Sequence, residues 1–338
     1  MTEPFSSFMR RALFDPENGY YSRRIRTVGE RGDFSTAATL SSLLAAGVAG
    51  WLRSELRAQP KIRAVIEVGG GDGSLMSGVR KDIGWWTRRG LKWHMVETSP
   101  VLRGQQKAKL GSKNVTWHDD LESALREAGG RAFIYHNELL DAFPCDRIEW
   151  DAESGTWREV WVRSERGEPA REELRERCWS DAEVAAFQAL SDWTSATPPP
   201  SPRQRVELHA SVRDWLSEWS REWKSGAMLT IDYGDLFPQV YHRRPRGTIR
   251  GYLHQQRTEG AEIYLNPGRQ DLTADINFSD YGRWATDLGW SEVFFGSLRG
   301  FLNQHAADRV NRASGIDAQM IEEGSAADAF QCVVHRPV

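Results

Sequence analysis

The chain has few cysteines, no long apolar run and no excess of positive charge. Cys145, Cys178 and Cys332 lie far apart, and neither they nor the histidines show a spacing typical of metal ligands. We therefore expect no disulfide framework and no metal site. No apolar stretch approaches the roughly 20 residues of a transmembrane helix. The net charge of -3 leaves no basic surplus for nucleic acid, so neither a membrane nor nucleic acid is an expected partner.

The N-terminal residues lack the character of a signal or transit peptide. Glu3, Asp15 and Glu17 place acidic charge where such peptides are basic or apolar. Together with the sparse cysteines, this predicts a reducing, cytoplasmic location. The 338 residues suffice for one large domain or for a domain with a substantial insertion.

The 15 tryptophans are an unusual feature of the composition. Trp215, Trp219 and Trp223 are spaced by four and would share one face of a helix. Two interpretations are open: a packed stripe, or a surface for a partner or an aromatic ligand.

Strands alternate with helices over much of the first half of the chain. Two helices are predicted first, at 4–14 and 39–58. Strands are predicted at 64–68, 92–97, 115–117 and 132–136, with helices at 74–83, from Ser99-Pro100 onward, and at 121–128. This order predicts an α/β fold with a doubly wound parallel sheet that is covered by helices on both faces.

The alternation breaks after the fourth strand. Residues 146–164 predict a hairpin, and 165–204 a charged, then Pro-rich surface insertion that is helical near 180–193. A helix at 206–224, a strand at 227–231, an aperiodic stretch at 235–275, a helix at 279–288 and strands at 292–295 and 330–335 follow. We therefore expect an N-terminal helical segment at 1–60, a core at 61–145 and 205–338, and an inserted subdomain at 146–204.

A glycine-rich turn follows the first strand of the alternating region, in the sequence EVGGGDGS. It has no Gly-Lys-Ser/Thr, which excludes a P-loop. The dinucleotide fingerprint would need glycine where Ser74 stands. The pattern is instead Glu67-x-Gly69-x-Gly71-x-Gly73, the motif of S-adenosylmethionine (SAM)-dependent methyltransferases.

The chemistry of these residues suits SAM. Glycines let the backbone approach the ligand, and the turn leaves amides for its carboxylate. Glu67 is a candidate for the ammonium group, directly or through water. Glu97, at the end of the second strand, is placed for the ribose hydroxyls. Asp119 is a candidate for the adenine amino group, although it or Asp120 can instead be a helix N-cap.

Several short motifs together resemble one family, the MidA-like SAM-dependent methyltransferases, which includes a mitochondrial complex I assembly arginine methyltransferase. The motifs are FMRRALFDPENGYYSRR, GERGDFST, EVGGGDGSLM, VETSPVLRGQQ, HNELLDAFP, LTIDYGD, TIRGYLHQ and PGRQDLTADINF. The resemblance implies a Rossmann-like class I methyltransferase fold, SAM as the cofactor and methyl transfer to an arginine nitrogen. This chain differs from the family in having Gly70 where proline is usual, and Leu139 and Leu140 where aromatics are usual.

The resemblance also implies roles for individual residues. A loop over the cofactor would consist of Gly32, Asp33, Phe34 and Thr36. Asn137, Glu138 and Asp141, just beyond the fourth strand, would face the methyl group and its acceptor, although all three also suit loop capping or a turn. His254, in a polar stretch, is a candidate base.

Other functions stay open at this point. The acceptor can be a protein, a peptide or a small molecule, and a small natural product would be methylated at nitrogen or oxygen. A non-catalytic SAM-binding assembly protein is a third alternative. An NAD dehydrogenase is disfavoured by Ser74. The hairpin and the Trp-rich helix are candidates for a homodimer interface.

Overall fold

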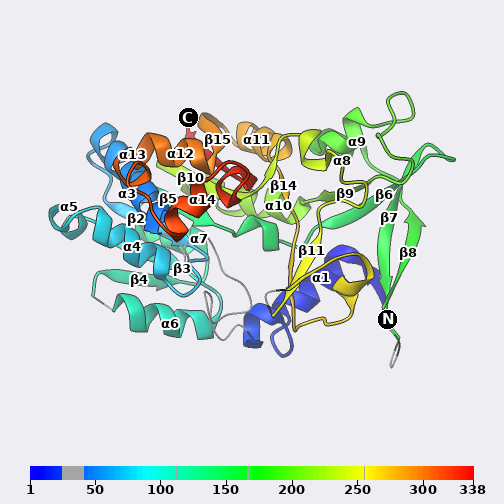
Figure 1. The fold of residues 1–338 in the computed structure, drawn as a ribbon, viewed down its shortest axis with the longest axis horizontal. Coiled ribbons are helices and arrows are strands. Elements are labelled where there is room, and N and C mark those ends of the chain that lie inside the picture. The colour runs from blue at the N-terminus through cyan, green and yellow to red at the C-terminus, as the bar shows by residue number, and fades with distance from the viewer. Residues whose placement is uncertain (25–41, 112, 166–167, 169, 255) are drawn as a thin grey trace. The chain divides into compact units, whose positions relative to one another are not determined.

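A computed structural model describes residues 1–24, 42–111, 113–165, 168, 170–254 and 256–338 (Figure 1). The chain divides into two compact units. Unit 1 comprises Met1–Arg24, Leu140–Trp215 and Gly234–Trp284. Unit 2 comprises Ile25–Leu139, Leu216–Tyr233 and Ala285–Val338. Each unit is therefore assembled from segments that are far apart in the sequence.

Unit 2 is built on a mixed sheet. Its strands are β2 (Ala64–Val68), β3 (Lys92–Val96), β4 (Val115–His118), β5 (Arg131–Asn137), β10 (Ser225–Asp235), β15 (Trp290–Ser297) and β16 (Phe330–Pro337). They lie in the order β15-β16-β10-β5-β2-β3-β4. The pairs from β10 to β4 are parallel, and β16 runs antiparallel to β10 and β15. The chain passes from β2 to β3 and β4 on one side and places β5 on the other, so its direction across the sheet reverses at β2.

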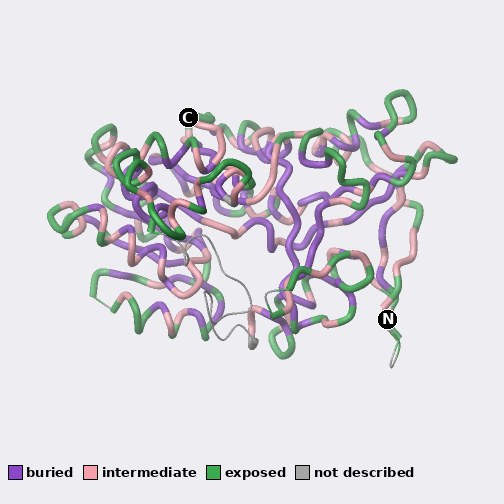
Figure 2. The backbone as a smooth tube through the Cα atoms, viewed as in Figure 1, coloured by how far each residue is buried: buried purple, intermediate pink, exposed green. Residues whose placement is uncertain are grey.

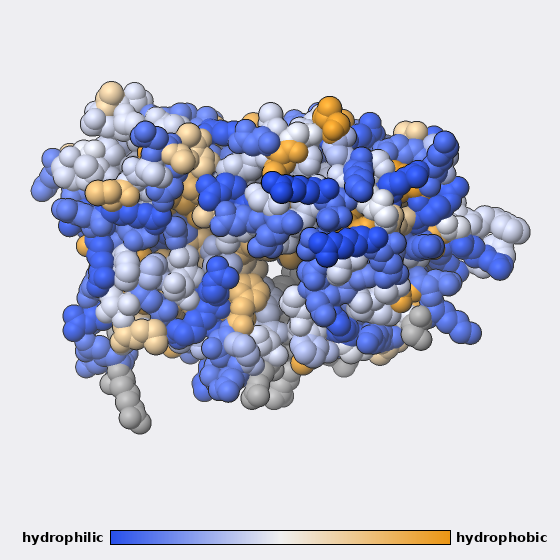
Figure 3. Space-filling model, turned by 180° about the vertical axis from the view of Figure 1, so that it is seen from behind, coloured by the Kyte–Doolittle hydropathy of each residue, from blue (hydrophilic) through white to orange (hydrophobic). Residues whose placement is uncertain are grey.

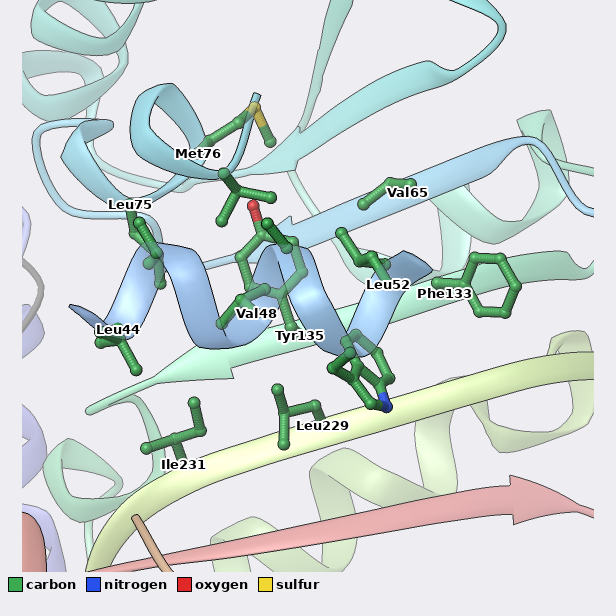
Figure 4. Packing of buried hydrophobic residues seen from close by; sticks show 14 of the residues in the cluster. Leu44, Val48, Leu52, Val65, Leu75, Met76, Phe133, Tyr135, Leu229 and Ile231 are labelled. Carbon is green, nitrogen blue, oxygen red and sulfur yellow. The ribbon is translucent and has the colours of Figure 1, made fainter. Parts of the chain in front are cut away.

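The helices of unit 2, with the exception of α5, supply apolar side chains that pack around this sheet. They are α3 (Ser42–Ala58), α4 (Ser74–Asp82), α5 (Trp85–Arg89), α6 (Pro100–Leu110), α7 (Leu121–Glu127), α12 (Leu298–His305), α13 (Ala307–Val310), α14 (Ile316–Ile321) and α15 (Ala326–Ala329). Leu44, Val48 and Leu52 recur at helical spacing along α3 and face β2, β5 and β10, where Val65 and Leu229 meet them (Figure 4). Every residue of β2 is buried, whereas α5 buries none (Figure 2).

Unit 1 is mostly antiparallel. The strands β1 (Thr2–Pro4), β6 (Asp146–Asp151), β7 (Thr156–Arg163) and β9 (Arg205–Leu208) lie in the order β1-β7-β6-β9, and β8 (Arg171–Glu176) also pairs with β7. A smaller sheet has the order β12 (Gln256–Thr258), β11 (Arg250–Leu253), β13 (Asp271–Thr273). Its other elements are α1 (Phe5–Phe14), η1 (Tyr20–Arg24), η2 (Leu140–Ala142), α8 (Asp181–Ala186), α9 (Gln188–Asp192), η4 (Gln239–Tyr241), η5 (Gly260–Tyr264) and β14 (Ile276–Asn277). Two helices, α10 (Ala210–Trp219) and α11 (Phe278–Asp287), continue from unit 1 into unit 2, and η3 (Ser220–Glu222) belongs to unit 2.

The strongly periodic elements match the sequence predictions. The strand at 64–68 has the predicted bounds, and the hairpin at 146–164 is formed by β6 and β7. The predicted helix at 206–224 is wrong at both ends. Residues 205–208 form β9, which pairs with β6, and the helix spans only Ala210–Trp219. Tertiary pairing overrides the local helical pattern there.

Two further regions contain strands that were not predicted from the sequence. The stretch at 235–275, expected to be aperiodic, contains the β12-β11-β13 sheet. The charged insertion at 165–204 contains β8, whose sequence REELRE has no apolar alternation. The strand β8 depends on hydrogen bonds to β7 rather than on an apolar face, and local sequence does not encode such pairing.

The tryptophan stripe is packed but does not follow a single helix. Trp219 ends α10 and stacks on Trp290, with ring centroids 5.2 Å apart. Trp223 lies beyond the helix, and its indole N–H donates to the backbone oxygen of Ala132 at 3.2 Å. Both side chains are buried, so the packed interpretation is confirmed for these two.

Among the described residues, no helix combines the length and apolarity that crossing a bilayer requires. The face drawn in Figure 3 is mostly hydrophilic, with apolar residues in small separate patches.

Candidate cofactor site

Three parallel strands of unit 2 end at one edge of the sheet, and predicted site residues follow each of them. The glycine-rich turn follows β2, Glu97 follows β3, and the Asn137-Glu138 pair lies at the end of β5. Because the chain reverses direction across the sheet at β2, this edge is a topological switch point. Open α/β sheets bind their ligands at such points.

The turn holds three glycines in the left-handed region that side chains rarely enter. The φ angles of Gly69, Gly71 and Gly73 are +65°, +52° and +84°. The N–H of Gly69 donates to the backbone of β3 at 3.0 Å. The N–H groups of Gly70, Gly71 and Asp72 donate to none of the residues that the structure describes. The turn therefore presents a row of amides that suits an anionic group.

Gly70 is a glycine for a different reason, because its φ is not left-handed. A Cβ at this position would lie 2.7 Å from Sδ of Met95 and 3.0 Å from Cδ of Glu67. A bulkier residue fits only if Met95 moves. The same crowding would oppose the proline that the sequence resemblance leads one to expect here.

Glu67 is a buried carboxyl beneath the turn, with a relative exposure of 2%. Its Oε2 accepts a hydrogen bond from the hydroxyl of Tyr135 at 3.2 Å. Burial raises the pKa of Glu67 to about 8, although the Tyr135 hydrogen bond opposes that rise. An ammonium group beside this carboxyl would favour its ionised form, as the predicted role requires.

Glu97 is fixed through both carboxylate oxygens. Oε1 accepts from the backbone N–H of Ser99 at 2.8 Å, and Oε2 accepts from Nε2 of Gln106 at 3.0 Å. Burial raises its pKa, against the hydrogen bonds from Ser99 and Gln106. Each oxygen keeps a further lone pair, so the group can still accept from two hydroxyls.

Gln106 contacts two residues of the candidate site, although no sequence motif marks it. It is completely buried on α6. Its Nε2 also donates to the backbone oxygen of Gly71 at 2.7 Å, and its Oε1 accepts from the indole N–H of Trp117 at 3.1 Å. It therefore joins the turn to Glu97. The available signal was a glutamine four residues after Leu102, on the buried face of the helix.

The predicted adenine ligand Asp119 lies just beyond β4, with its side chain 84% exposed. It pairs with Arg103 at 2.5 Å. The N-cap of α7 is Asp120, which accepts from the N–H of Ser123 at 2.7 Å. The capping alternative therefore applies to Asp120, and the adenine role of Asp119 stays a prediction.

Asn137 and Glu138 form a strained pair at the end of β5. Glu138 has a φ of +50°, which costs about 1–3 kcal/mol for a residue with a side chain. Nδ2 of Asn137 donates to Oε1 of Glu138 at 2.9 Å. Oδ1 of Asn137 is buried and has no hydrogen-bond partner among the described residues. The pair thus keeps an acceptor available for a donor from a bound molecule.

Asp232 anchors the backbone around this pair. It is fully buried, and its two carboxylate oxygens accept from the N–H groups of Leu139 at 3.1 Å and Tyr233 at 2.9 Å. The N–H of Glu138 donates to the backbone oxygen of Ile231 at 3.0 Å. These contacts hold the ends of β5 and β10 together and maintain the strained conformation.

The remaining predicted site residues belong to unit 1 or are not described. Asp141 is buried in η2 of unit 1. Burial is the largest cause of the raised pKa of Tyr21, followed by the charge of Asp271 and then by that of Asp141. His254 is exposed in unit 1 between β11 and β12, with a φ of +48°. The predicted loop residues Gly32, Asp33, Phe34 and Thr36 lie outside the described residues. All of these roles stay predictions.

Known proteins are similar to this chain along most of its length. A model of the family described as "Putative S-adenosyl-L-methionine-dependent methyltransferase" matches residues 47–295. The protein arginine methyltransferase NDUFAF7, mitochondrial, of Xenopus tropicalis is 26% identical over 305 residues, 81% of this chain and 65% of that protein. Its Danio rerio counterpart is 28% identical over 319 residues, 85% of this chain and 69% of that protein. The chain thus spans about two thirds of the length of these relatives.

A solved structure shares the fold. A superfamily member from Burkholderia thailandensis, crystallised with bound S-adenosyl-homocysteine, superposes with a TM-score of 0.82 at 24% identity. The match covers 99% of this chain and 88% of that one. The predicted α/β methyltransferase fold is confirmed.

The expected cytoplasmic location is wrong. Both curated relatives are named as mitochondrial proteins. The acidic residues at the start of the sequence were the basis of that expectation, and they do not decide the compartment.

Proposed function

The chain belongs to the family of S-adenosyl-L-methionine-dependent methyltransferases, and from this premise we propose that it methylates a nitrogen of an arginine side chain in a protein or peptide. The observation that carries the proposal is the edge of the unit 2 sheet. There a left-handed glycine turn, Glu97 and the strained Asn137-Glu138 pair follow three parallel strands. The arginine acceptor is supported by the names of the curated relatives.

The residues at this edge fit the cofactor. The N–H groups of Gly70 and Gly71 would bind its carboxylate, Glu67 its ammonium group and Glu97 its ribose hydroxyls. Asp119 would accept from the adenine amino group. The predicted loop of Gly32, Asp33, Phe34 and Thr36 would cover the ligand. When bound, SAM supplies a methyl group activated by a positively charged sulfur.

The acceptor would be oriented by the residues after β5. Oδ1 of Asn137, buried without a partner among the described residues, would accept a hydrogen bond from the attacking nitrogen and align it. The carboxylate of Glu138 would attract the guanidinium and take up the proton that it releases. We assign supporting roles to Asp141, in binding the acceptor's charge, and to His254, in accepting a proton.

The architecture suggests how this machinery is organised along the chain. The strand order, with parallel strands on both sides of β2 and an antiparallel β16, supports a doubly wound, class I methyltransferase layout. In that interpretation, residues 61–145 and 205–338 form the core and 146–204 an inserted subdomain, and residues 1–60 form an N-terminal helical segment with a loop that covers the cofactor.

Cofactor binding and methyl transfer can be tested separately. Calorimetry with SAM, S-adenosyl-homocysteine and NAD⁺ should show binding of the first two only, and Glu97→Gln should weaken both. A folded protein with no affinity for SAM would refute the cofactor assignment.

Transfer is tested with methyl-labelled SAM and a cell lysate. We expect the label in a protein band, and acid hydrolysis of that band should release methylarginine. Label in small molecules would replace the proposal with a natural-product methyltransferase. SAM binding without any transfer would indicate a non-catalytic assembly protein. The matched control is a pair of peptides with the sequence around the labelled site, one with arginine and one with lysine at that position; only the arginine peptide should be methylated.

A further inference from the structure

We propose that unit 2 also carries a divalent transition-metal site formed by His94, His118 and Glu127. The three side chains offer two imidazole nitrogens and one carboxylate oxygen. Nothing in methyl transfer from SAM requires them, so the site stands independently of the proposed function. It also differs from the absence of a metal that the sequence spacing predicts.

The donor atoms already lie near coordination geometry. Nδ1 of His94 and Nε2 of His118 are 3.0 Å apart, and the latter lies 3.8 Å from Oε2 of Glu127. All three atoms fall within 4.8 Å of one another. Ligands bound tetrahedrally at about 2.0–2.2 Å lie about 3.3–3.6 Å apart. The two nitrogens therefore need to move little, and Glu127 must swing inward.

The sheet brings these ligands together from three elements. His118 on β4 is paired with Val96 on β3, and His94 lies two residues before Val96. Paired residues and residues two apart share one face of a sheet, so both imidazoles lie on the same face. Helix α7 packs against β3 and β4 and places Glu127, its last residue, beside them. Ligands 24 residues apart on neighbouring strands leave no spacing motif in the sequence.

Exposure is divided in a way that suits metal entry. His94 and His118 are buried, at 1% and 8% relative exposure, which holds their rings in place. The Glu127 side chain is 53% exposed and can close over an incoming ion from solvent. Two histidines and one carboxylate leave a fourth position for water, as in open zinc sites. Imidazole and carboxylate ligands favour Zn²⁺ or Co²⁺ over Ca²⁺ or Mg²⁺.

A metal-free pair of histidines is the competing explanation. One imidazole would simply donate a hydrogen bond to the other, and Glu127 would be a surface carboxylate. The two explanations differ in whether Glu127 matters for metal affinity.

The site is also joined to the cofactor edge, because the backbone oxygen of His118 accepts from the N–H of Glu97 at 3.1 Å.

The test uses the untagged full chain, treated with a chelator and titrated with Co²⁺ and, by calorimetry, with Zn²⁺. We expect one ion per chain and visible Co²⁺ bands of a four- or five-coordinate site. Glu127→Gln should weaken affinity at least about tenfold, and His94→Gln should abolish the bands. His242→Gln, at an exposed histidine of unit 1, is the control and should bind like the unaltered chain.

Two results would overturn the proposal. One is the absence of saturable binding and of visible Co²⁺ bands. The other is unchanged affinity in Glu127→Gln, which would leave the metal-free histidine pair as the explanation. Should His94→Gln fail to fold by circular dichroism, Glu127→Gln still decides, because its half-exposed side chain can change without disturbing the core.

Discussion

Replacing Gln106 by methionine tests whether the cofactor edge depends on a residue that need not touch the cofactor. Methionine has a similar length and flexibility but cannot form strong hydrogen bonds. The change removes the contacts of Gln106 to the backbone of Gly71, to Glu97 and to Trp117, at 2.7, 3.0 and 3.1 Å. Little cavity is created, so the effect reports on polar contacts.

The magnitude follows from those three hydrogen bonds. Each contributes about 0.5–1.5 kcal/mol net, and the bond to the Glu97 carboxylate about 1.5–3 kcal/mol. The free energy of unfolding should therefore fall by about 2.5–6 kcal/mol. If SAM binding loses about 1.5 kcal/mol, the lower end of the range for the hydrogen bond to Glu97, the Kd for SAM rises about tenfold.

The assay combines urea unfolding with calorimetric titration of SAM. Gln105→Met, at the half-buried neighbour on α6, is the matched control because it leaves the Gln106 contacts in place. A double-mutant cycle with Glu97→Gln should show effects on Kd that are clearly less than additive, since Gln106 is expected to act through that carboxylate.

The positioning role of Gln106 is refuted if Gln106→Met binds SAM as tightly as the unaltered chain while its stability falls. The contact would then support the fold alone. Strict additivity with Glu97→Gln would likewise contradict the positioning role, because the two residues would act independently.

Three further predictions concern the same edge. Glu138→Gln should lower the rate of transfer about 10²-fold or more and change the SAM Kd little; single-turnover kinetics with labelled SAM measures both, and equal losses would assign Glu138 to cofactor retention. The pKa of Glu67 is raised to about 8 in the folded chain, so its stabilising contribution is complete below its unfolded pKa near 4.5 and is lost as the pH rises to about 8. The free energy of unfolding should fall across that pH range, and the fall should be smaller in Glu67→Gln. Equal pH dependence of stability in Glu67→Gln and the unaltered chain would show that Glu67 is not the cause. Gly70→Ala should destabilise the fold by about 1–3 kcal/mol, because the new Cβ would meet the side chain of Met95. Thermal melts should show that Gly70→Ala lowers the melting temperature less in a Met95→Ala background than in the unaltered chain.

The sequence by itself determined the parts whose chemistry is local. The strand at 64–68 and the three left-handed glycines after it could be predicted because a tight strand–helix turn needs glycine at fixed positions. The position of Glu97 directly after β3 could be predicted from the strand pattern, whereas its binding role stays a prediction. The motifs along the chain also led to the methyltransferase family.

Only the tertiary structure decided which residues act together. Gln106 joins the turn to Glu97, and Asp232 supports the loop after β5, through contacts between residues 35 and 93 positions apart. The His94–His118 pair likewise depends on strand register. Local sequence records which side chains are available, whereas pairing across a sheet sets the distances between them. Contacts at those distances then determine each carboxyl's burial, its hydrogen bonds and its pKa.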